Sequence, residues 1–321
     1  MSNSVLEVKD LDLSFKTTKG ELQALSEVSF TISEGEIVGL VGESGCGKSI
    51  TSLSIMGLNS EETSLIKNGT ITFNDQDMTK WSQDQFQKIR GKDISMIFQE
   101  PMTSLNPVLS IKDQLTEGIR LHLKLSRKEA QKHVLNILEK VGIPKSRNIL
   151  DEYPHQLSGG MRQRVMIAMA LACNPKLLIA DEPTTALDVT IQAQILELLK
   201  EINREYKTSM LFITHDLGVV SEICDRVIVM YAGQVIETGT VDDILHNPRH
   251  PYTKGLLNSV PKIMETRKRL DTIQGTVPQL SQMPKGCRFA PRCKHATQTC
   301  MNKPKMVNVD NEHYARCFYA V

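Results

Sequence analysis

The stretch Gly42-Glu-Ser-Gly-Cys-Gly-Lys48-Ser49 decides the fold of this chain. It fits the pattern G-x-x-x-x-G-K-[ST], it ends the apolar run EIVGLVG, and residues 49–57 continue with helical spacing. Its three glycines let the backbone curl so that successive N–H groups point at phosphate oxygens. The following helix directs its positive end at the same place. A strand before the motif and a helix after it predict a phosphate loop in an α/β fold.

Each residue of this loop has an expected role toward a bound nucleotide. Lys48 would supply a positive charge to the β- and γ-phosphates, and the Ser49 hydroxyl would bind Mg²⁺. The expected ATP contacts are Gly42, Glu43, Ser44, Gly45, Cys46, Gly47, Lys48, Ser49 and Ile50. Cys46 has two interpretations: a small tolerated side chain, or a thiol whose oxidation blocks ATP binding.

Two adjacent carboxylates follow a second apolar run. The sequence LLIADEP places Asp181 and Glu182 at the end of a short buried strand. Asp181 is expected to hold Mg²⁺, and Glu182 to polarise the attacking water as general base. The structural alternative is an Asp-Glu pair that caps a helix.

The order of apolar patterns predicts a parallel sheet with helices. Short buried runs, LLIA and SMLFIT among them, alternate with helical stretches such as 165–173 and 191–205. Residues 110–141 carry long helical patterns, so a mostly helical subdomain is expected over about 90–165. Seven of the 13 prolines lie after about residue 239. We therefore expect a nucleotide-binding domain over 1–245 and a distinct extension over 246–321.

Composition narrows the class of protein. The 321 residues include 38 Lys and Arg against 37 Asp and Glu, a net charge of +1, which excludes a generally basic nucleic-acid binder. No apolar run approaches the roughly 18 residues that indicate a membrane-spanning helix. The N-terminal sequence MSNSVLEVKD has no basic patch followed by an apolar segment, so the chain is expected to stay in the cytoplasm.

The octad Leu157-Ser-Gly-Gly-Met-Arg-Gln-Arg164 makes the prediction more specific. It resembles the signature sequence of ATP-binding cassette (ABC) ATPases, and the order of motifs is similar to that family over about the first 240 residues. The resemblance implies a RecA-like core, an antiparallel β subdomain and an α-helical subdomain. It also implies that two cassettes sandwich two ATP molecules, so that each signature faces the ATP held by the partner cassette.

The resemblance assigns further residues. Gln99 resembles the Q-loop glutamine and would reach Mg²⁺ or the water, His215 resembles the switch histidine at the γ-phosphate, and Phe15 is the expected adenine-stacking aromatic. The catalytic set it implies is therefore Glu182, His215 and Gln99, with Mg²⁺ held through Ser49, Gln99 and Asp181. The residues expected to face the partner's ATP are Leu157, Ser158, Gly159, Gly160, Met161 and Asp188.

Two other stretches resemble one subgroup, the ATPases of peptide and nickel importers. They are EPMTSLNP at 100–107 and NPRHPYT at 247–253. The subgroup implies an ATP-hydrolysing subunit that powers uptake of oligopeptides or dipeptides across the cell membrane. This subunit would lie at the cytoplasmic face of the membrane. Its partners would be a second, similar but different ATPase, two membrane permeases and an extracellular binding protein. Nickel chelates are the alternative cargo, and a soluble ABC ATPase of translation or DNA repair and a free-standing regulator are alternative classes.

The extension carries four cysteines, Cys287, Cys293, Cys300 and Cys317. Their gaps are wider than those of common zinc sites. The spacing resembles the segment that holds a [4Fe–4S] cluster in some members of the subgroup, and a zinc site that includes His295 or His313 and a metal-free basic tail are the alternatives. Residues 262–305 contain ten Lys and Arg against two acidic residues, and such cations would stabilise an anionic thiolate cluster.

Overall fold

The computed structural model of the chain describes residues 4–18, 20–99, 104–143, 146–185, 187–259 and 273–320. The chain divides into two compact units. One unit contains residues 1–5, 32–36 and 81–213, and the other contains residues 6–31, 37–80 and 214–321. Within the described ranges, no helix is both long enough and apolar enough to cross a membrane. The segments 100–103 and 262–272, which include part of the expected post-Q-loop stretch and of the basic stretch, lie outside the described residues.

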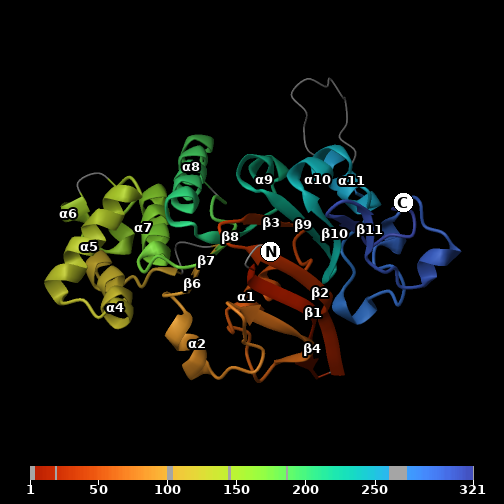
Figure 1. Cartoon of the computed structure of the whole chain (residues 1–321), viewed down its shortest axis with the longest axis horizontal. Helices are drawn as coiled ribbons and strands as arrows, with labels where there is room; N and C mark the ends of the chain where they lie inside the picture. The colour runs from red at the N-terminus through yellow and green to blue at the C-terminus, as the bar shows by residue number, and fades with distance from the viewer. Residues whose placement is uncertain are drawn as a thin grey trace. The chain divides into compact units, whose positions relative to one another are not determined.

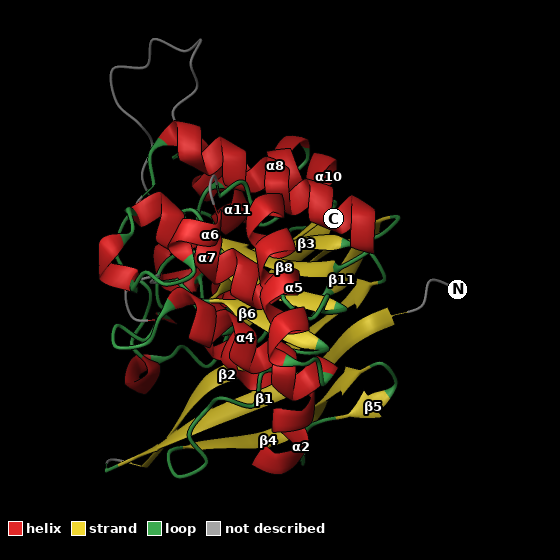
Figure 2. Cartoon of the chain, turned by 90° about the vertical axis from the view of Figure 1, so that its left-hand side faces the viewer, coloured by secondary structure: helices red, strands yellow, loops and turns green. Residues whose placement is uncertain are grey.

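The second unit begins with an antiparallel sheet in the order β2-β1-β4-β5. Its strands are β1 (Ser4–Thr17), β2 (Gly20–Ser33), β4 (Ser64–Phe73) and β5 (Gln76–Asp77). Buried and exposed positions alternate along much of β2, as expected when one face of a sheet packs on a core. Figure 2 shows β1, β2 and β4 side by side.

The same unit contains the strand that precedes the phosphate loop, β3 (Ile37–Val41), which is buried throughout and pairs in parallel with β9 (Arg226–Tyr231). Antiparallel strands β10 (Gln234–Thr240), β12 (His313–Ala315) and β11 (Val307–Asp310) continue outward from β9. The helices of this unit are α1 (Lys48–Ile55), α9 (Leu217–Ile223), α10 (Val241–His246) and α11 (Pro251–Asn258). The C-terminal residues thus extend the sheet that carries the phosphate loop.

The first unit contains a parallel, fully buried set of strands in the order β8-β7-β6. They are β6 (Ile94–Ile97), β7 (Leu177–Asp181) and β8 (Ser209–Thr214), and LLIA and SMLFIT therefore form strands as predicted. Its helices are α2 (Gln83–Ile89), α4 (Ile111–Leu123), α5 (Arg127–Lys140), α6 (Ser146–Ile149), α7 (Gly159–Leu171) and α8 (Val189–Tyr206). Helices α4 to α7 gather in one bundle (Figure 1).

Serine caps explain where three helices of this bundle begin. The hydroxyls of Ser110, Ser126 and Ser158 each accept a hydrogen bond from the backbone N–H three residues later. Such a cap satisfies one of the N–H groups that have no partner within the helix. Residues 110–141 therefore form two helices, α4 and α5, and Ser126 caps the start of the second.

A buried carboxylate ties the C-terminal residues to the sheet. Glu237 on β10 is fully buried, and its two oxygens accept from the backbone N–H groups of Arg249 at 2.6 Å and His250 at 2.9 Å. The imidazole Nε2 of His313 on β12 lies 2.8 Å from the same carboxylate. Three partners compensate for removing this charge from water, so Glu237 holds the turn before α11 and the edge of the sheet together.

We predict that Glu237→Gln lowers the free energy of unfolding by about 2–4 kcal/mol, because an amide group would face backbone donors that now meet carboxylate oxygens. Urea denaturation of the purified chain measures the loss. The control is Glu62→Gln, which changes the same charge on an exposed residue of the same unit. Equal unfolding midpoints for the two variants would contradict the role assigned to Glu237.

Candidate functional site

The phosphate loop owes its shape to two glycines that no other residue can replace. A Cβ on Gly42 would lie 2.3 Å from the carbonyl oxygen of Met230 and 2.6 Å from the sulfur of Cys46. Gly47 caps α1 with a φ of 109°, which is accessible to glycine and strained for other residues. The loop therefore turns sharply from β3 into α1, as the motif predicts.

The side chain of Lys48 bonds to the backbone of this loop. Its ammonium group is buried and donates to the carbonyl oxygens of Gly42 at 2.7 Å and Glu43 at 3.2 Å. Ser44, Gly45 and Ser49 are exposed, so the outer rim of the loop faces solvent. The loop thus presents an open surface above a fixed positive charge, which is the arrangement that binds phosphate.

The position of Cys46 decides between its two interpretations. Its side chain is fully buried, with its sulfur 3.8 Å from the ammonium of Lys48. Burial raises the pKa of the thiol, and this effect outweighs the opposing influence of Lys48. Because thiolate is the reactive form, a buried thiol with a raised pKa reacts slowly. The structure favours a small packing residue.

The carboxylate pair stands at the end of β7, in the other unit. Asp181 is buried, and Glu182 has a positive φ of 46° with its carboxylate partly exposed. Gln99, two residues after β6, donates from Nε2 to Oε2 of Glu182 at 3.0 Å. Thr185 donates its hydroxyl to the same oxygen at 2.9 Å. The structure therefore brings Gln99 and Glu182 into contact, while the expected role of Gln99 toward Mg²⁺ or the water stays a prediction.

Helix caps test the structural alternative for this pair. The helix that follows, α8, is capped by Asp188, whose Oδ1 accepts from the N–H of Ile191 at 2.9 Å. Neither Asp181 nor Glu182 caps it. Asp188 therefore has a structural task in addition to the partner-facing role that the family resemblance implies.

The signature residues surround the start of α7. Ser158 caps the helix, with its hydroxyl 3.3 Å from the N–H of Met161, and Leu157 is buried beside it. Ser158 and Gly159 are exposed, and a Cβ on Gly159 would meet no atom within 4 Å. The positive end of a helix of 13 residues is therefore open to an approaching anion.

Two residues assigned from the resemblance lie in the unit that contains the phosphate loop. His215 follows β8 and is exposed. Phe15 lies on β1, partly exposed, opposite Ser64 of β4. Their roles toward ATP remain predictions.

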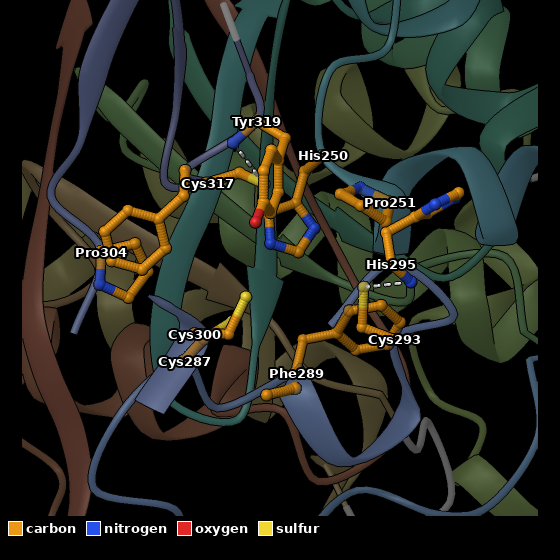
Figure 3. Close-up of a pocket in the computed structure, with 12 residues that line it drawn as sticks. His250, Pro251, Cys287, Phe289, Cys293, His295, Cys300, Pro304, Cys317 and Tyr319 are labelled. Atoms are coloured by element: carbon orange, nitrogen blue, oxygen red, sulfur yellow. Dashed lines mark hydrogen bonds between the residues drawn. The ribbon is translucent and has the colours of Figure 1, made fainter. Parts of the chain in front are cut away.

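The four cysteines of the extension line one pocket (Figure 3). Its volume is about 320 Å³, open mouth included, and Phe289 and His295 complete the part of the wall nearest the sulfurs. Each cysteine is a free thiol, and burial raises the pKa of Cys287, Cys293 and Cys317. Sulfurs separated by up to 30 residues of sequence therefore face the same small volume.

Backbone donors point at two of these sulfurs. The N–H of His295 lies 3.4 Å from the sulfur of Cys293, and the N–H of Tyr319 lies 3.4 Å from that of Cys317. The N–H of Ala290 donates to the carbonyl oxygen of Cys287 at 3.0 Å. Donors at a sulfur stabilise it as an anion, and N–H···S bonds are one of the means by which proteins tune thiolate-bound clusters.

Two observations bear on a single metal ion in this pocket. Among the described residues, no group of three or more His, Cys, Asp and Glu is placed to hold a metal ion. His313, a possible zinc ligand in the sequence, is bound to Glu237 and is not part of the pocket wall. His295 remains at the wall, exposed.

Two residues that contact the phosphate loop were not predicted from the sequence. The phenol oxygen of Tyr252 on α11 accepts from the N–H of Glu43 at 2.9 Å, and Arg292 forms an ion pair with the Glu43 carboxylate. Tyr252 is fully buried, and burial raises its pKa. Arg292 entered the sequence analysis only as one of ten basic residues, and nothing in the local pattern distinguishes it.

The phosphate loop, the carboxylate pair and the signature helix together define an ATP-binding cassette. Residues 25–185, about half of the chain, match the ABC transporter family. Residues 236–300 match the family described as the C-terminal region of oligopeptide/dipeptide transporters. The chain belongs to the ABC transporter ATPases.

Relatives resemble it over nearly its whole length. The oligopeptide transport ATP-binding protein AppD of Bacillus subtilis (strain 168) is 55% identical over 317 residues, which cover 98% of this chain and 97% of AppD. The dipeptide transport ATP-binding protein DppD of the same organism is 55% identical over 296 residues, or 92% of this chain and 88% of DppD.

A solved structure matches the cassette part. It is the dimeric post-hydrolysis state of the ATP-binding cassette MJ0796 bound to ADP and Pi. The match has a TM-score of 0.66 and 30% identity, and it covers 74% of this chain and 98% of that one. The remaining quarter of the chain has no counterpart in that match.

We predict that Cys46 in the native protein reacts with iodoacetamide at least roughly tenfold more slowly than in urea, because the thiol is buried and its pKa is raised. Peptide mapping by mass spectrometry measures the two rates. Cys46→Ala should leave ATP affinity nearly unchanged. Rapid native labelling of Cys46 that abolishes ATP binding would restore the redox interpretation.

Proposed function

We propose that the chain is the ATP-hydrolysing subunit of an ABC importer that takes up oligopeptides or dipeptides. The observation that carries this proposal is 55% identity to an oligopeptide transport ATP-binding protein over 98% of the chain. The match of residues 236–300 to the peptide-transporter C-terminal region supports the same cargo. We assign residues 1–245 to the ATPase domain, with a helical subdomain over about 90–165, and residues 246–321 to the extension.

The residues divide the chemistry of ATP hydrolysis among them. Loop residues 42–50 bind the phosphates, with Lys48 opposing their charge, and Phe15 stacks on adenine. Ser49, Asp181 and Gln99 hold Mg²⁺, which when bound neutralises charge that develops on the phosphate oxygens. Glu182 accepts a proton from the attacking water, and His215 contacts the γ-phosphate.

The hydrogen bond between Gln99 and Glu182 supports the assignment of the base. A general base must present its free oxygen to the water in one orientation. The Gln99 amide and the Thr185 hydroxyl both donate to Oε2 of Glu182, at 3.0 and 2.9 Å. Both donors restrict the orientation of the Glu182 carboxylate.

A second ATPase chain completes the site. The open start of α7, with residues 157–161 and Asp188, faces the γ-phosphate of the partner's ATP, and the partner's signature faces the ATP of this chain. Closure then depends on the γ-phosphate, and its loss favours opening. We propose a similar but different ATPase as the partner, so that the pair is a heterodimer.

The pair docks on two membrane permeases at the cytoplasmic face, and an extracellular binding protein delivers the cargo. Exposed apolar side chains next to the Q-loop support the docking surface: Phe98 is 41% exposed and Val108 is 76% exposed. These exposed apolar groups are accessible to a partner protein.

We propose that Cys287, Cys293, Cys300 and Cys317 hold a [4Fe–4S] cluster, with zinc as the alternative occupant. Support comes from the shared pocket and from the N–H groups that point at the sulfurs of Cys293 and Cys317. When bound, the cluster would cross-link four short segments of an extension with few apolar residues.

We predict that Glu182→Gln retains ATP binding and abolishes ATP turnover and peptide uptake, because the amide cannot accept the proton. The measurement is uptake of a labelled peptide into proteoliposomes that contain this chain, the partner ATPase and both permeases, with binding protein added. Glu201→Gln, an exposed change on α8, is the matched control. If the wild type takes up a nickel chelate but no peptide, the cargo is a nickel chelate and the peptide proposal is wrong. If Glu182→Gln completes multiple turnovers at near wild-type rate, Glu182 is not the general base.

We predict that protein purified without oxygen is coloured, with broad visible absorbance and about four irons and four sulfides per chain, as four-cysteine ligation of a cubane cluster implies. Cys300→Ser should reduce the iron content strongly, because Cys300 is one of the four cysteines that line the pocket. Cys173→Ser, a change of a buried thiol in the other unit, should not. One zinc per chain without iron would select the alternative occupant.

A further inference from the structure

Glu43 is an unexpected residue for its place. It follows the first glycine of a loop whose task is to attract polyphosphate, and a carboxylate there repels the ligand. Its side chain is 27% exposed, so solvent screens this charge only in part. Some other group has to neutralise it for the loop to bind an anion well.

Arg292 supplies the opposite charge from the C-terminal extension. One of its terminal nitrogens lies 2.6 Å from Oε2 of Glu43, and the other lies 3.0 Å from Oε1. Both carboxylate oxygens are therefore held by a planar fork of donors, which is the strongest geometry for such a pair. The two partners are 249 positions apart in the sequence, so the folding of the chain brings them into contact.

The guanidinium is itself fixed from several sides. Its side chain is 5% exposed, and it donates to the carbonyl oxygens of Gln274 at 2.9 Å and Gly275 at 3.1 Å. It also lies over the ring of Tyr231, 5.7 Å from the ring centre. Arg292 is thus a rigid anchor.

The anchor acts on the part of the loop that positions Lys48. Glu43 donates its N–H to Tyr252 and accepts the Lys48 ammonium on its carbonyl oxygen at 3.2 Å. Its side chain and its backbone are therefore both fixed by the C-terminal residues. A shift of Glu43 would move the carbonyl that orients the lysine.

We infer that Arg292 is a positioning residue of the ATP site. It neutralises Glu43 and holds the phosphate loop in its ATP-binding shape, so the C-terminal extension contributes to nucleotide affinity through this ion pair. The inference rests on the proposed role of the loop in ATP binding. Arg292 touches Glu43 and acts through it on the loop.

The test measures the affinity of the purified full-length chain for a fluorescent ATP analogue without Mg²⁺, where no hydrolysis occurs. Arg292→Gln should weaken binding roughly tenfold, because it leaves a partly buried carboxylate unpaired beside the phosphates. Lys294→Gln, which removes an exposed positive charge two residues away, should bind like the wild type. Wild-type binding and its loss in Lys48→Ala establish the loop as the ATP site independently.

A second substitution separates a charge effect from a general loss of structure. Removing the carboxylate as well, in Glu43→Gln/Arg292→Gln, should return the affinity to within about threefold of wild type, since the repulsion has gone. The defect of Arg292→Gln alone should shrink as salt rises, because salt screens the unpaired carboxylate. Should Arg292→Gln fail to fold, Arg292→Lys keeps the charge without the fork and should bind about threefold more weakly than wild type.

Three results would overturn the inference while the wild type still binds ATP. They are wild-type affinity in Arg292→Gln, no recovery in the double variant, and wild-type affinity in Arg292→Lys when Arg292→Gln does not fold. If the wild type itself does not bind the analogue, the proposed function fails instead.

Discussion

The phosphate loop depends on a backbone that the regular hydrogen bonds of strands and helices do not hold. Those of its N–H groups that bind phosphate cannot be used to hold the loop, so other parts of the molecule must fix its shape. The turn between β9 and β10 does so at one side, where the N–H of Gly233 donates to the carbonyl of Cys46 at 2.7 Å. Strand β2 holds that turn, since Ser26 donates its N–H to the carbonyl oxygen of Gly233 at 2.8 Å. The antiparallel sheet, the sheet turn and the loop thus form one continuous support.

The C-terminal residues support the loop from a different direction, and charge explains why they fit there. Residues 1–261 carry a net charge of −6, while residues 262–305 carry an excess of eight positive charges. Among the described residues of that stretch, Arg292 pairs with Glu43 and Lys303 pairs with Glu27 at 2.8 Å. Arg316, farther on, pairs with Glu27 at 2.9 Å. Arg292 and Lys303 therefore bind acidic residues of the cassette, a use of the basic stretch that composition alone does not predict.

The parts of this structure that depend on local chemistry could be predicted from the sequence. The phosphate loop, the strands LLIA and SMLFIT and the helix starts at Ser110 and Ser158 follow from residues within a few positions of one another. Contacts between distant segments have no such pattern. Glu237 binds His313 across 76 residues, and this pairing removes from the pocket a histidine that the sequence offered as a zinc ligand. No periodicity or spacing records which carboxylate a given basic side chain will meet.

The contact between Gln99 and Glu182 shows how a transporter ATPase can link its chemistry to its surroundings. Gln99 lies two residues after β6 and is preceded by Phe98, which is 41% exposed. Its amide holds one oxygen of Glu182 at 3.0 Å, so the orientation of the carboxylate depends on where the chain after β6 is placed. A protein that covers Phe98 and moves this segment by an ångström or more would break a hydrogen bond of this length. With Glu182 as the proposed general base, hydrolysis is then expected to respond to a surface outside the nucleotide site, because Gln99 belongs to the segment after β6 and contacts Glu182.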